Sequence, residues 1–230
     1  MRRHDWTGFA ALGAAIASVI ALLAGARAWA AVGLAITIVL GVLTRYWSLK
    51  YRGPMPHLLR WTLWVPRGNQ SPNHLKQILE PQAGERMLEI GPGVGIHSLP
   101  IATQLAPGGS LDVFDIQQAM LDDVMRSARA AGIDNIVAQQ GDAQKLPYQD
   151  QAFDAGYLVG VLGEIPDGGA ALRELRRVLK PNGRLVVGEV IFDPDFVSFG
   201  SLVEELRVAG FAFERRLGGS LSYLARFRCA

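Results

Sequence analysis

The residues best suited to chemistry are a glycine-rich segment and the acidic residues that follow it. The segment reads Glu89-Ile90-Gly91-Pro92-Gly93-Val94-Gly95. Its glycines let the backbone turn sharply and approach a ligand, and a helix expected to begin at Ile96 offers free amides to polar or negative groups. Alone, this segment indicates only a nucleotide-like ligand, because dinucleotide-binding folds also use a glycine-rich turn.

Two aspartates extend the pattern. Asp115 lies twenty residues after Gly95, at the end of an apolar run, where a carboxylate can accept both hydroxyls of a ribose. The alternative for Asp115 is an ordinary turn residue at a strand end. Asp142 follows Gly141, a pairing that is common in turns. Its position after the glycine-rich segment and Asp115 gives it more weight as a ligand contact.

Short apolar runs alternate with helical stretches after Pro81, and these elements must position the acidic residues. The expected strands are 86–90, 110–114, 135–139, 153–159 and 184–191, and the expected helices are 96–105, 118–131 and 169–179. This alternation predicts an α/β fold with a doubly wound, mostly parallel sheet. A helix at 202–209 and an antiparallel pair at 212–217 and 221–228 complete seven strands.

With these motifs in order, the chain from about Gln82 to Gly188 resembles the class I S-adenosylmethionine-dependent methyltransferases, particularly the group of ubiquinone and menaquinone biosynthesis methyltransferases. The resemblance rests on 88–95, with an acid two places before the first glycine, and on 146–154 and 172–183. It implies a Rossmann-like fold, methyltransferase activity and S-adenosylmethionine as the cofactor.

The resemblance also implies the cofactor contacts. Glu89 would help to hold the cofactor ammonium, Asp115 would accept from the ribose, and Asp142 would accept from the adenine amino group. The other predicted contacts are the loop glycines Gly91, Gly93 and Gly95, the adenine-flanking Ile116 and Met120, and Ala143 and Leu158.

The sequence does not identify a general base, which methyl transfer needs only when the acceptor loses a proton. Many relatives have a histidine where Gly163 stands. Glu164 is the nearest carboxylate, although its position is also typical of a helix start. His97 could reach the cofactor end of the site, although a lone histidine is more often structural. The catalytic group therefore stays unknown, with Glu164 and His97 as weak candidates and His57 and His74 similarly weak.

Two uncharged apolar runs, 9–26 and 28–44, stand near the N-terminus with only Arg27 between them. As helices they would each span roughly 25 to 27 Å, close to the hydrocarbon thickness of a bilayer. One continuous helix would place Arg27 near the bilayer centre, at a cost of about 2.5 to 3.5 kcal/mol. We therefore expect a two-helix transmembrane hairpin over 1–52, with its turn at 24–29.

The flanking basic residues indicate the orientation of this hairpin. They lie on one side of it, and they are Arg2, Arg3, Arg45, Lys50 and Arg52. The positive-inside rule assigns that side to the cytoplasm, which predicts an inner or cytoplasmic membrane protein whose catalytic domain faces the cytoplasm. The less favoured alternatives are a signal peptide cleaved near Ala28-Trp29-Ala30 and a buried hairpin of a soluble protein.

Residues 53–80 are expected to form an amphipathic connection to a methyltransferase domain at 81–230. The residues that suggest it are Leu58, Trp61 and Val65 on one helical face, with Arg60 and Arg67 nearby. Tryptophan beside arginine suits a helix in the membrane interface, and a lid over the active site is an equal alternative.

Charge and cysteine content narrow the partners. A net charge of +2 gives no general attraction to nucleic acid. The single cysteine, Cys229, excludes an intrachain disulfide and a cysteine-based metal site, and no metal is expected. Anchoring favours a membrane lipid or lipophilic acceptor, such as a prenylated quinol precursor or an aminophospholipid. The rivals are a catalytically inactive S-adenosylmethionine-binding scaffold at the membrane and a nicotinamide-dependent reductase.

Overall fold

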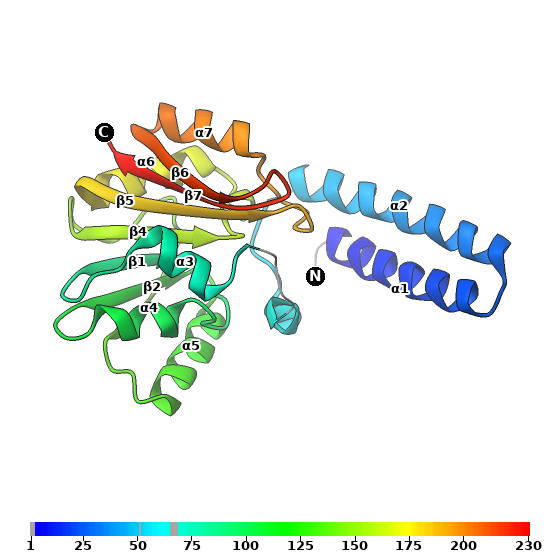
Figure 1. Ribbon diagram of the computed structural model, residues 1–230, viewed down its shortest axis with the longest axis horizontal. Helices are drawn as coiled ribbons and strands as arrows, with labels where there is room; N and C mark the ends of the chain where they lie inside the picture. Colours follow the sequence, from blue (N-terminus) through cyan, green and yellow to red (C-terminus); the bar gives the residue numbers. More distant parts are fainter. Residues whose placement is uncertain (1–2, 51, 65–68) are drawn as a thin grey trace. The chain divides into compact units, whose positions relative to one another are not determined.

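The computed structural model describes residues 3–50, 52–64 and 69–230, and the chain divides into two units, one up to Gly53 and one from Pro54 (Figure 1). Arg2, Val65 and Arg67, which entered the sequence predictions, lie outside the described residues.

The first unit is a helical hairpin of α1 (Arg3–Leu23) and α2 (Arg27–Lys50), which lie side by side (Figure 1). Gly25, in the turn between them, has a φ of 76°. A Cβ on Gly33 would lie 2.2 Å from Ser18 Oγ, so the close approach of the helices requires glycine. The hydroxyls of Ser18 and Thr37 donate to backbone carbonyls one turn earlier, at 2.7 and 2.9 Å. Small residues at the contact and internally satisfied hydroxyls are typical of helices that pack in an apolar medium.

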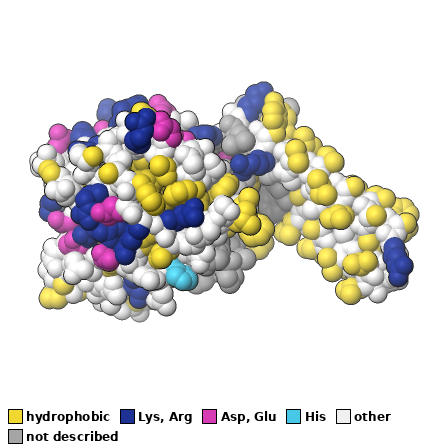
Figure 2. All heavy atoms as spheres, turned by 45° about the horizontal axis from the view of Figure 1, so that its top comes forward, with side chains coloured by type: hydrophobic (Ala, Val, Ile, Leu, Met, Phe, Trp, Pro, Cys, Tyr) yellow, Lys and Arg dark blue, Asp and Glu magenta, His cyan; other side chains and the backbone are white. Residues whose placement is uncertain are grey.

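The two helices of the hairpin differ in apolar length. Among the described residues, only the segment Arg27–Trp47 of α2 is long and apolar enough to cross a membrane. The apolar part of α1 is Ala10–Leu23, about 21 Å at 1.5 Å per residue. The helix α1 ends at Leu23, and residues 24–26, the last of the uncharged run, form the turn. The expectation of two spanning helices is thus supported only for α2, whose side chains are mostly hydrophobic and exposed (Figure 2).

A seven-stranded sheet forms the centre of the second unit, with strand order β3-β2-β1-β4-β5-β7-β6 (Figure 1). The pairs from β3 to β5 are parallel, and β7 is antiparallel to both β5 and β6. The strands are β1 (Arg86–Ile90), β2 (Ser110–Asp115), β3 (Ile136–Gln140), β4 (Phe153–Val159), β5 (Leu179–Val190), β6 (Phe211–Gly218) and β7 (Ser222–Cys229). The predicted mostly parallel seven-stranded α/β sheet is confirmed.

Helices cover both faces of this sheet, as a doubly wound fold requires. One buried cluster joins the sheet to α3 (Pro72–Leu79), α4 (Ser98–Leu105) and α5 (Gln118–Ala130). The other joins the opposite face to α6 (Gly168–Val178) and α7 (Phe199–Val208). Met87 and Leu88, neighbours on β1, belong to different clusters because successive side chains of a strand point to opposite faces.

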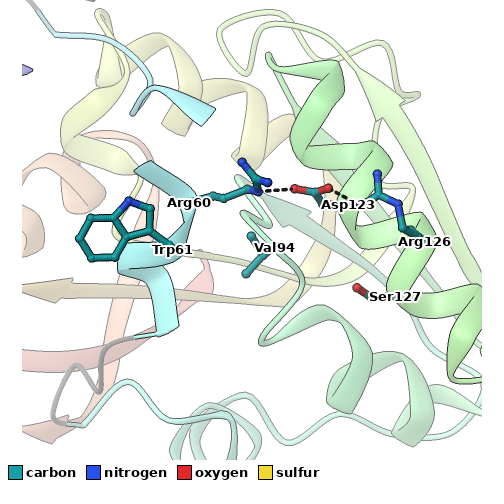
Figure 3. Close-up of a pocket in the computed structure, with 6 residues that line it drawn as sticks. All are labelled: Arg60, Trp61, Val94, Asp123, Arg126 and Ser127. Carbon is teal, nitrogen blue, oxygen red and sulfur yellow. Dashed lines mark hydrogen bonds and ion pairs between the residues drawn. The ribbon is translucent and has the colours of Figure 1, made fainter. Parts of the chain in front are cut away.

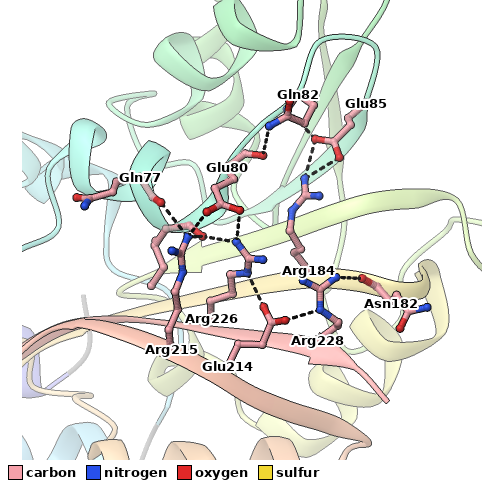
Figure 4. Close-up of polar contacts among 11 residues, drawn as sticks. Gln77, Glu80, Gln82, Glu85, Asn182, Arg184, Glu214, Arg215, Arg226 and Arg228 are labelled. Atoms are coloured by element: carbon pink, nitrogen blue, oxygen red, sulfur yellow. Dashed lines mark hydrogen bonds and ion pairs between the residues drawn. The ribbon is translucent and has the colours of Figure 1, made fainter.

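A network of ion pairs fastens the segment that follows α3 to the last strands of the sheet (Figure 4). Arg226 on β7 contacts Glu80 at 2.7 Å and Glu214 at 2.6 Å. Arg184 on β5 donates to both oxygens of Glu85, at 2.7 and 2.6 Å, just before β1 begins. Charge-assisted and bidentate contacts of this kind are stronger than neutral hydrogen bonds. They hold the start of β1, and so the loop that follows it, against the rest of the sheet.

Candidate functional site

The glycine-rich loop, residues 91–97, connects the carboxyl end of β1 to α4. Gly91 and Gly93 have φ values of 67° and 56°, which other residues rarely adopt. A Cβ on Gly91 would also lie 2.4 Å from the Val161 side chain. The Gly91 amide donates to the Phe114 carbonyl at 2.8 Å and so ties the loop to β2. The helix begins at Ser98, two residues later than the sequence predicts, and Gly95 has a φ of 86°.

Glu89 lies on β1 directly before this loop and is only 3% exposed. Ser98 Oγ donates to Glu89 Oε2 at 2.5 Å. Burial raises the pKa of Glu89 to about 7, against the opposing effect of the Ser98 hydrogen bond. A buried carboxyl of this kind favours a cationic ligand, because a nearby positive charge stabilises its ionised form.

Asp115 ends β2, the strand next to β1. Its Oδ1 accepts from the Gln117 amide at 2.8 Å, and burial raises its pKa to about 6. Ile116, the next residue, is 49% exposed at this edge of the sheet, whereas Met120 is buried in α5. The side chains of Asp115 and Ile116 are thus accessible to a ligand, as their predicted contacts with ribose and adenine require. Met120 could reach adenine only through a small change in packing.

Asp142 follows β3 and is exposed. Both of its oxygens accept from Gln144 Nε2, at 2.9 and 2.8 Å. Ala143 beside it is buried, and Leu158 at the end of β4 is completely buried in the core. The sheet register places Glu89, Asp115 and Asp142 at the carboxyl ends of three adjacent parallel strands. The structure therefore brings the predicted acids to one edge, while Leu158 has a packing position.

Residues 54–64, which we call the strap, cross this edge and include the 3₁₀ helix η1 (His57–Trp64). The Met55 amide donates to Glu164 Oε2 at 3.1 Å, and the Met55 carbonyl accepts from Gln117 Nε2 at 2.8 Å. A Cβ on Gly93 would lie 2.8 Å from Leu63 Cδ1, so Leu63 contacts the glycine-rich loop. The strap thus joins the ends of β2 and β4 and packs on the loop between them.

Asp123 on α5 anchors the outer side of the strap. His57 Nε2 lies 2.9 Å and Arg60 Nε 3.2 Å from Asp123 Oδ2, and Arg126 contacts Asp123 Oδ1 at 2.6 Å. Arg60 and Arg126 point toward Asp123 from opposite sides (Figure 3). A cavity of about 350 Å³ lies here, lined by Arg60, Trp61, Val94, Asp123, Arg126 and Ser127. Its lining includes none of the predicted cofactor acids, so it lies outside the predicted cofactor contacts.

Glu164, the first weak catalytic candidate, ends the 3₁₀ turn η2 (Leu162–Glu164) after β4 and is partly exposed. Burial and the negative charge of Asp193 raise its pKa well above the usual range. A Cβ on Gly163 would lie 1.9 Å from the Asp195 carbonyl oxygen. The segment after β5 therefore occupies the space of the side chain that the resemblance implies at position 163.

The three histidines of the second unit, His57, His74 and His97, are each engaged in a contact with another residue of the protein. His97 Nε2 lies 2.8 Å from the Gln70 carbonyl oxygen, and His74 Nδ1 lies 2.9 Å from Ser71 Oγ. His57 contacts Asp123 in the strap anchor. A structural role for each histidine is consistent with these contacts.

Sequence reasoning missed the Met55 bridge, the Asp195 contact with Gly163 and the buried Gln70. Met55 and Glu164 are 109 residues apart in the chain, and no local pattern connects them. The only sequence signal was the proline pair around Met55, which indicated an irregular segment.

The residues at this edge fit S-adenosylmethionine. The loop turns at Gly91 and Gly93, where side chains would collide with Val161 and Leu63, so its backbone can approach a ligand, and Glu89 provides a buried carboxyl for an ammonium group. Asp115 provides a carboxylate at the end of the adjacent strand, where a ribose can be held. Asp142 can accept from the adenine amino group once Gln144 no longer donates to one of the Asp142 oxygens.

Comparisons with known proteins agree with this fit. Residues 88–187 match a family model described as a methyltransferase domain. The chain is 36% identical to a demethylmenaquinone methyltransferase from Lactobacillus johnsonii over 112 residues, 48% of this chain and 46% of the relative. It is 31% identical to 27-O-demethylrifamycin SV methyltransferase from Amycolatopsis mediterranei over 141 residues, 60% of this chain and 50% of the relative. The chain thus spans about half the length of the curated relatives it matches.

Solved structures share the fold. A methyltransferase from Aquifex aeolicus described as S-adenosylmethionine-dependent superposes with a TM-score of 0.70 at 17% identity, covering 77% of this chain and all of that one. The [4+2]-cyclase SpnF superposes with a TM-score of 0.64 at 19% identity, over 77% of this chain and 97% of that one. The fold alone therefore does not specify the reaction. Together with the family match, however, these findings show that residues 88–187 are similar to a methyltransferase domain, and that similarity implies S-adenosylmethionine as the cofactor.

Proposed function

We propose that this protein is a membrane-anchored methyltransferase that transfers a methyl group from S-adenosylmethionine to a hydrophobic or lipid-like acceptor. A prenylated quinol precursor or an aminophospholipid fits this description. The observation that carries the proposal is the covalent connection of the methyltransferase domain to α2, the apolar helix that is long enough to span a membrane.

The length of that connection supports a lipophilic acceptor. Three residues lie between Lys50 at the end of α2 and Pro54 at the start of the strap, so the four chain steps that join them reach at most about 14 Å. If α2 spans the cytoplasmic membrane, the strap begins near the lipid headgroups, with the domain on the cytoplasmic side. Two of the curated relatives carry the name demethylmenaquinone methyltransferase, which favours a quinol-type acceptor.

The residues of the chain would bind the cofactor and exclude water. S-adenosylmethionine supplies an activated methyl group on a sulfonium sulfur, so the main catalytic tasks are alignment and desolvation. Glu89 would hold the ammonium, Asp115 the ribose hydroxyls and Asp142 the adenine amino group. The strap acts as a lid, because Met55 and Leu63 already contact the residues that border the cofactor edge.

Glu164 faces the strap at the acceptor end of this edge. Because its pKa is raised, Glu164 is protonated at a higher pH than an ordinary glutamate. It therefore suits a hydrogen bond to the acceptor, and it becomes a base when a cationic acceptor lowers its pKa.

The test is methyl transfer by the full chain in proteoliposomes. Purified protein is incubated with methyl-labelled S-adenosylmethionine and a total bacterial lipid extract, and label is counted in the organic phase. Asp115→Asn should lower this count at least tenfold, whereas Asp122→Asn, an exposed position on α5, should leave it unchanged.

Two outcomes would contradict the proposal. Label found only in water-soluble products would remove the lipophilic acceptor. Absence of S-adenosylmethionine binding in a calorimetric titration would remove the enzyme, and binding without any transfer would favour an inactive scaffold. A parallel titration with NADH tests the reductase alternative.

A further inference from the structure

Gln70 is a buried amide whose polar atoms lack partners. Its side chain belongs to a residue that is 5% exposed, and neither Nε2 nor Oε1 has a hydrogen-bond partner within the described part of the chain. Burying a donor and an acceptor without partners is unfavourable, so such a pair in a native structure requires an explanation, and a bound polar group is one that its position beside the loop favours.

Rigid neighbours fix the backbone at Gln70. Asn69 binds β7: its backbone amide donates to Ser222 Oγ at 3.2 Å and its Nδ2 to the Ser222 carbonyl at 3.4 Å. Ser71 is the N-cap of α3, and its Oγ accepts from the His74 amide at 3.3 Å. Because both neighbours are held, the buried amide is a feature of the fold and not of a fraying end.

The Gln70 backbone also lies against the end of the glycine-rich loop. Its carbonyl oxygen is 2.8 Å from His97 Nε2, and His97 is the N-cap of α4. The next residue, Ser98, donates to Glu89. Gln70, His97, Ser98 and Glu89 therefore form one continuous set of contacts beside the loop.

A carboxamide and a carboxyl in this arrangement suit a zwitterion. The amide has one NH₂ donor for a carboxylate and one carbonyl acceptor for an ammonium group, and Glu89 contributes negative charge beside the ammonium. The other buried atoms without partners are single atoms of Tyr148, Tyr157, Arg184 and Glu189, so Gln70 alone among them offers both a donor and an acceptor.

We propose that the Gln70 side chain binds the amino-acid end of S-adenosylmethionine, with Nε2 donating to the carboxylate and Oε1 accepting from the ammonium that Glu89 neutralises. The inference rests on the proposed function, because it assumes the same cofactor. Gln70 acts as a positioning residue that orients the amino-acid end of the cofactor and thereby its sulfonium carbon.

Ligands with and without the amino-acid end test this proposal directly. Full-length protein in detergent micelles is titrated calorimetrically with S-adenosylmethionine, S-adenosylhomocysteine and 5′-methylthioadenosine, which lacks the amino-acid end. Gln70→Leu removes both polar atoms at similar size. It should weaken binding of the first two ligands by about ten- to a hundredfold, the range for hydrogen bonds to charged groups, and leave 5′-methylthioadenosine within about twofold.

Matched variants complete the test. Gln77→Leu, at an exposed glutamine on α3, should bind all three ligands like the wild type. Gln70→Glu should show the same selective loss as Gln70→Leu, because the new carboxylate repels the carboxylate of the ligand. This variant provides the test if Gln70→Leu does not fold. Equal weakening of all three ligands, or no weakening, overturns the proposal. Failure of the wild type to bind S-adenosylmethionine counts against the proposed function instead.

Discussion

Glu89 is a residue whose protonation state is set by burial. Its carboxyl is 3% exposed and accepts from the Ser98 hydroxyl, and its pKa is raised to about 7. An ammonium group beside it would lower the pKa again, since an opposite charge favours the ionised form. Cofactor binding should therefore release a proton from the protein near neutral pH.

This coupling predicts pH-dependent cofactor binding. Below pH 7 the free protein holds a proton on Glu89, so the affinity for S-adenosylmethionine should fall as the pH decreases, by up to about tenfold per unit. Calorimetry between pH 5.5 and 7 measures the slope. Glu89→Gln should bind more weakly at pH 7 and lose most of this dependence above pH 6, whereas Asp115, with a pKa of about 6, continues to contribute below it. An equal slope in the variant would show that another group titrates.

The same substitution should stabilise the fold at higher pH. Because the folded-state pKa of Glu89 lies above its ordinary value of 4.5, the native state binds more protons between pH 4.5 and 7, and Glu89 lowers the free energy of unfolding as the pH rises through this window. Glu89→Gln should raise the free energy of unfolding at pH 8 by up to about 3 kcal/mol. Denaturant unfolding at pH 4 and pH 8 tests this, and a gain of equal size at both pH values would refute the cause.

At the scale of elements, the strap is held to the domain by a few polar contacts. Asp123 binds His57 and Arg60, and Met55 supplies two backbone hydrogen bonds. Segments held by few contacts open most readily. The strap can therefore separate from the glycine-rich loop without unfolding of the sheet.

Neutralising Asp123 should loosen the strap. Asp123→Asn weakens both ion pairs and should increase the hydrogen-exchange rate of amides in residues 54–64 severalfold, with faster release of S-adenosylmethionine. Asp122→Asn, on the same helix, should change neither rate. Hydrogen exchange by mass spectrometry and stopped-flow displacement are the measurements. Unchanged exchange in Asp123→Asn would mean that the strap is held elsewhere.

Gly163 and Gly200 offer a matched pair on two elements. A Cβ at Gly163 would meet the Asp195 carbonyl at 1.9 Å, whereas a Cβ at Gly200 in α7 meets nothing within 4 Å. Gly163→Ala should lower the free energy of unfolding by about 1 to 3 kcal/mol through overpacking. Gly200→Ala should raise it by about 0.5 to 1 kcal/mol through helix propensity. Thermal and denaturant unfolding measure both changes in the free energy of unfolding. No change for Gly163→Ala would mean that residues 191–198 shift at little energetic cost.

The sheet could be predicted from local sequence, whereas the contacts across its edge could not. Strands β1 and β4 match their predicted bounds, because apolar runs and flanking turn residues report local structure. Strand β5 begins earlier, at Leu179, because residues around Asn182, which has a positive φ, form an irregularity within the strand opposite Asp154 and do not end it. The strap contains a 3₁₀ helix and α1 ends at Leu23, which apolar spacing alone does not reveal.

For the site, the order of motifs predicted the acids Glu89, Asp115 and Asp142 at one edge. It did not reveal that Gln144 contacts Asp142 or that Leu158 is buried. Such features depend on how side chains pack in the folded protein, and local sequence patterns do not predict that packing.

For the whole molecule, the proposed membrane anchoring assigns to α2 the location of the domain. A charge at the middle of a spanning helix costs about 2.5 to 3.5 kcal/mol, whereas one near the interface costs much less. Ile38→Arg, near the middle of the apolar segment of α2, should therefore release a large part of the protein from membranes on alkaline carbonate extraction. Trp29→Arg, near the end of that segment, should remain membrane-bound. Equal retention of both variants would contradict a spanning role for α2.

The double hydrogen bond of Met55 has a consequence for the order of substrate addition. Its carbonyl accepts from Gln117 beside Asp115, the proposed ribose contact, and its amide donates to Glu164 on the proposed acceptor side. A movement of Met55 that admits the cofactor also breaks the contact with Glu164, so the two ends of the site are energetically coupled. Steady-state kinetics should then be sequential and ordered, with S-adenosylmethionine entering first and S-adenosylhomocysteine leaving last.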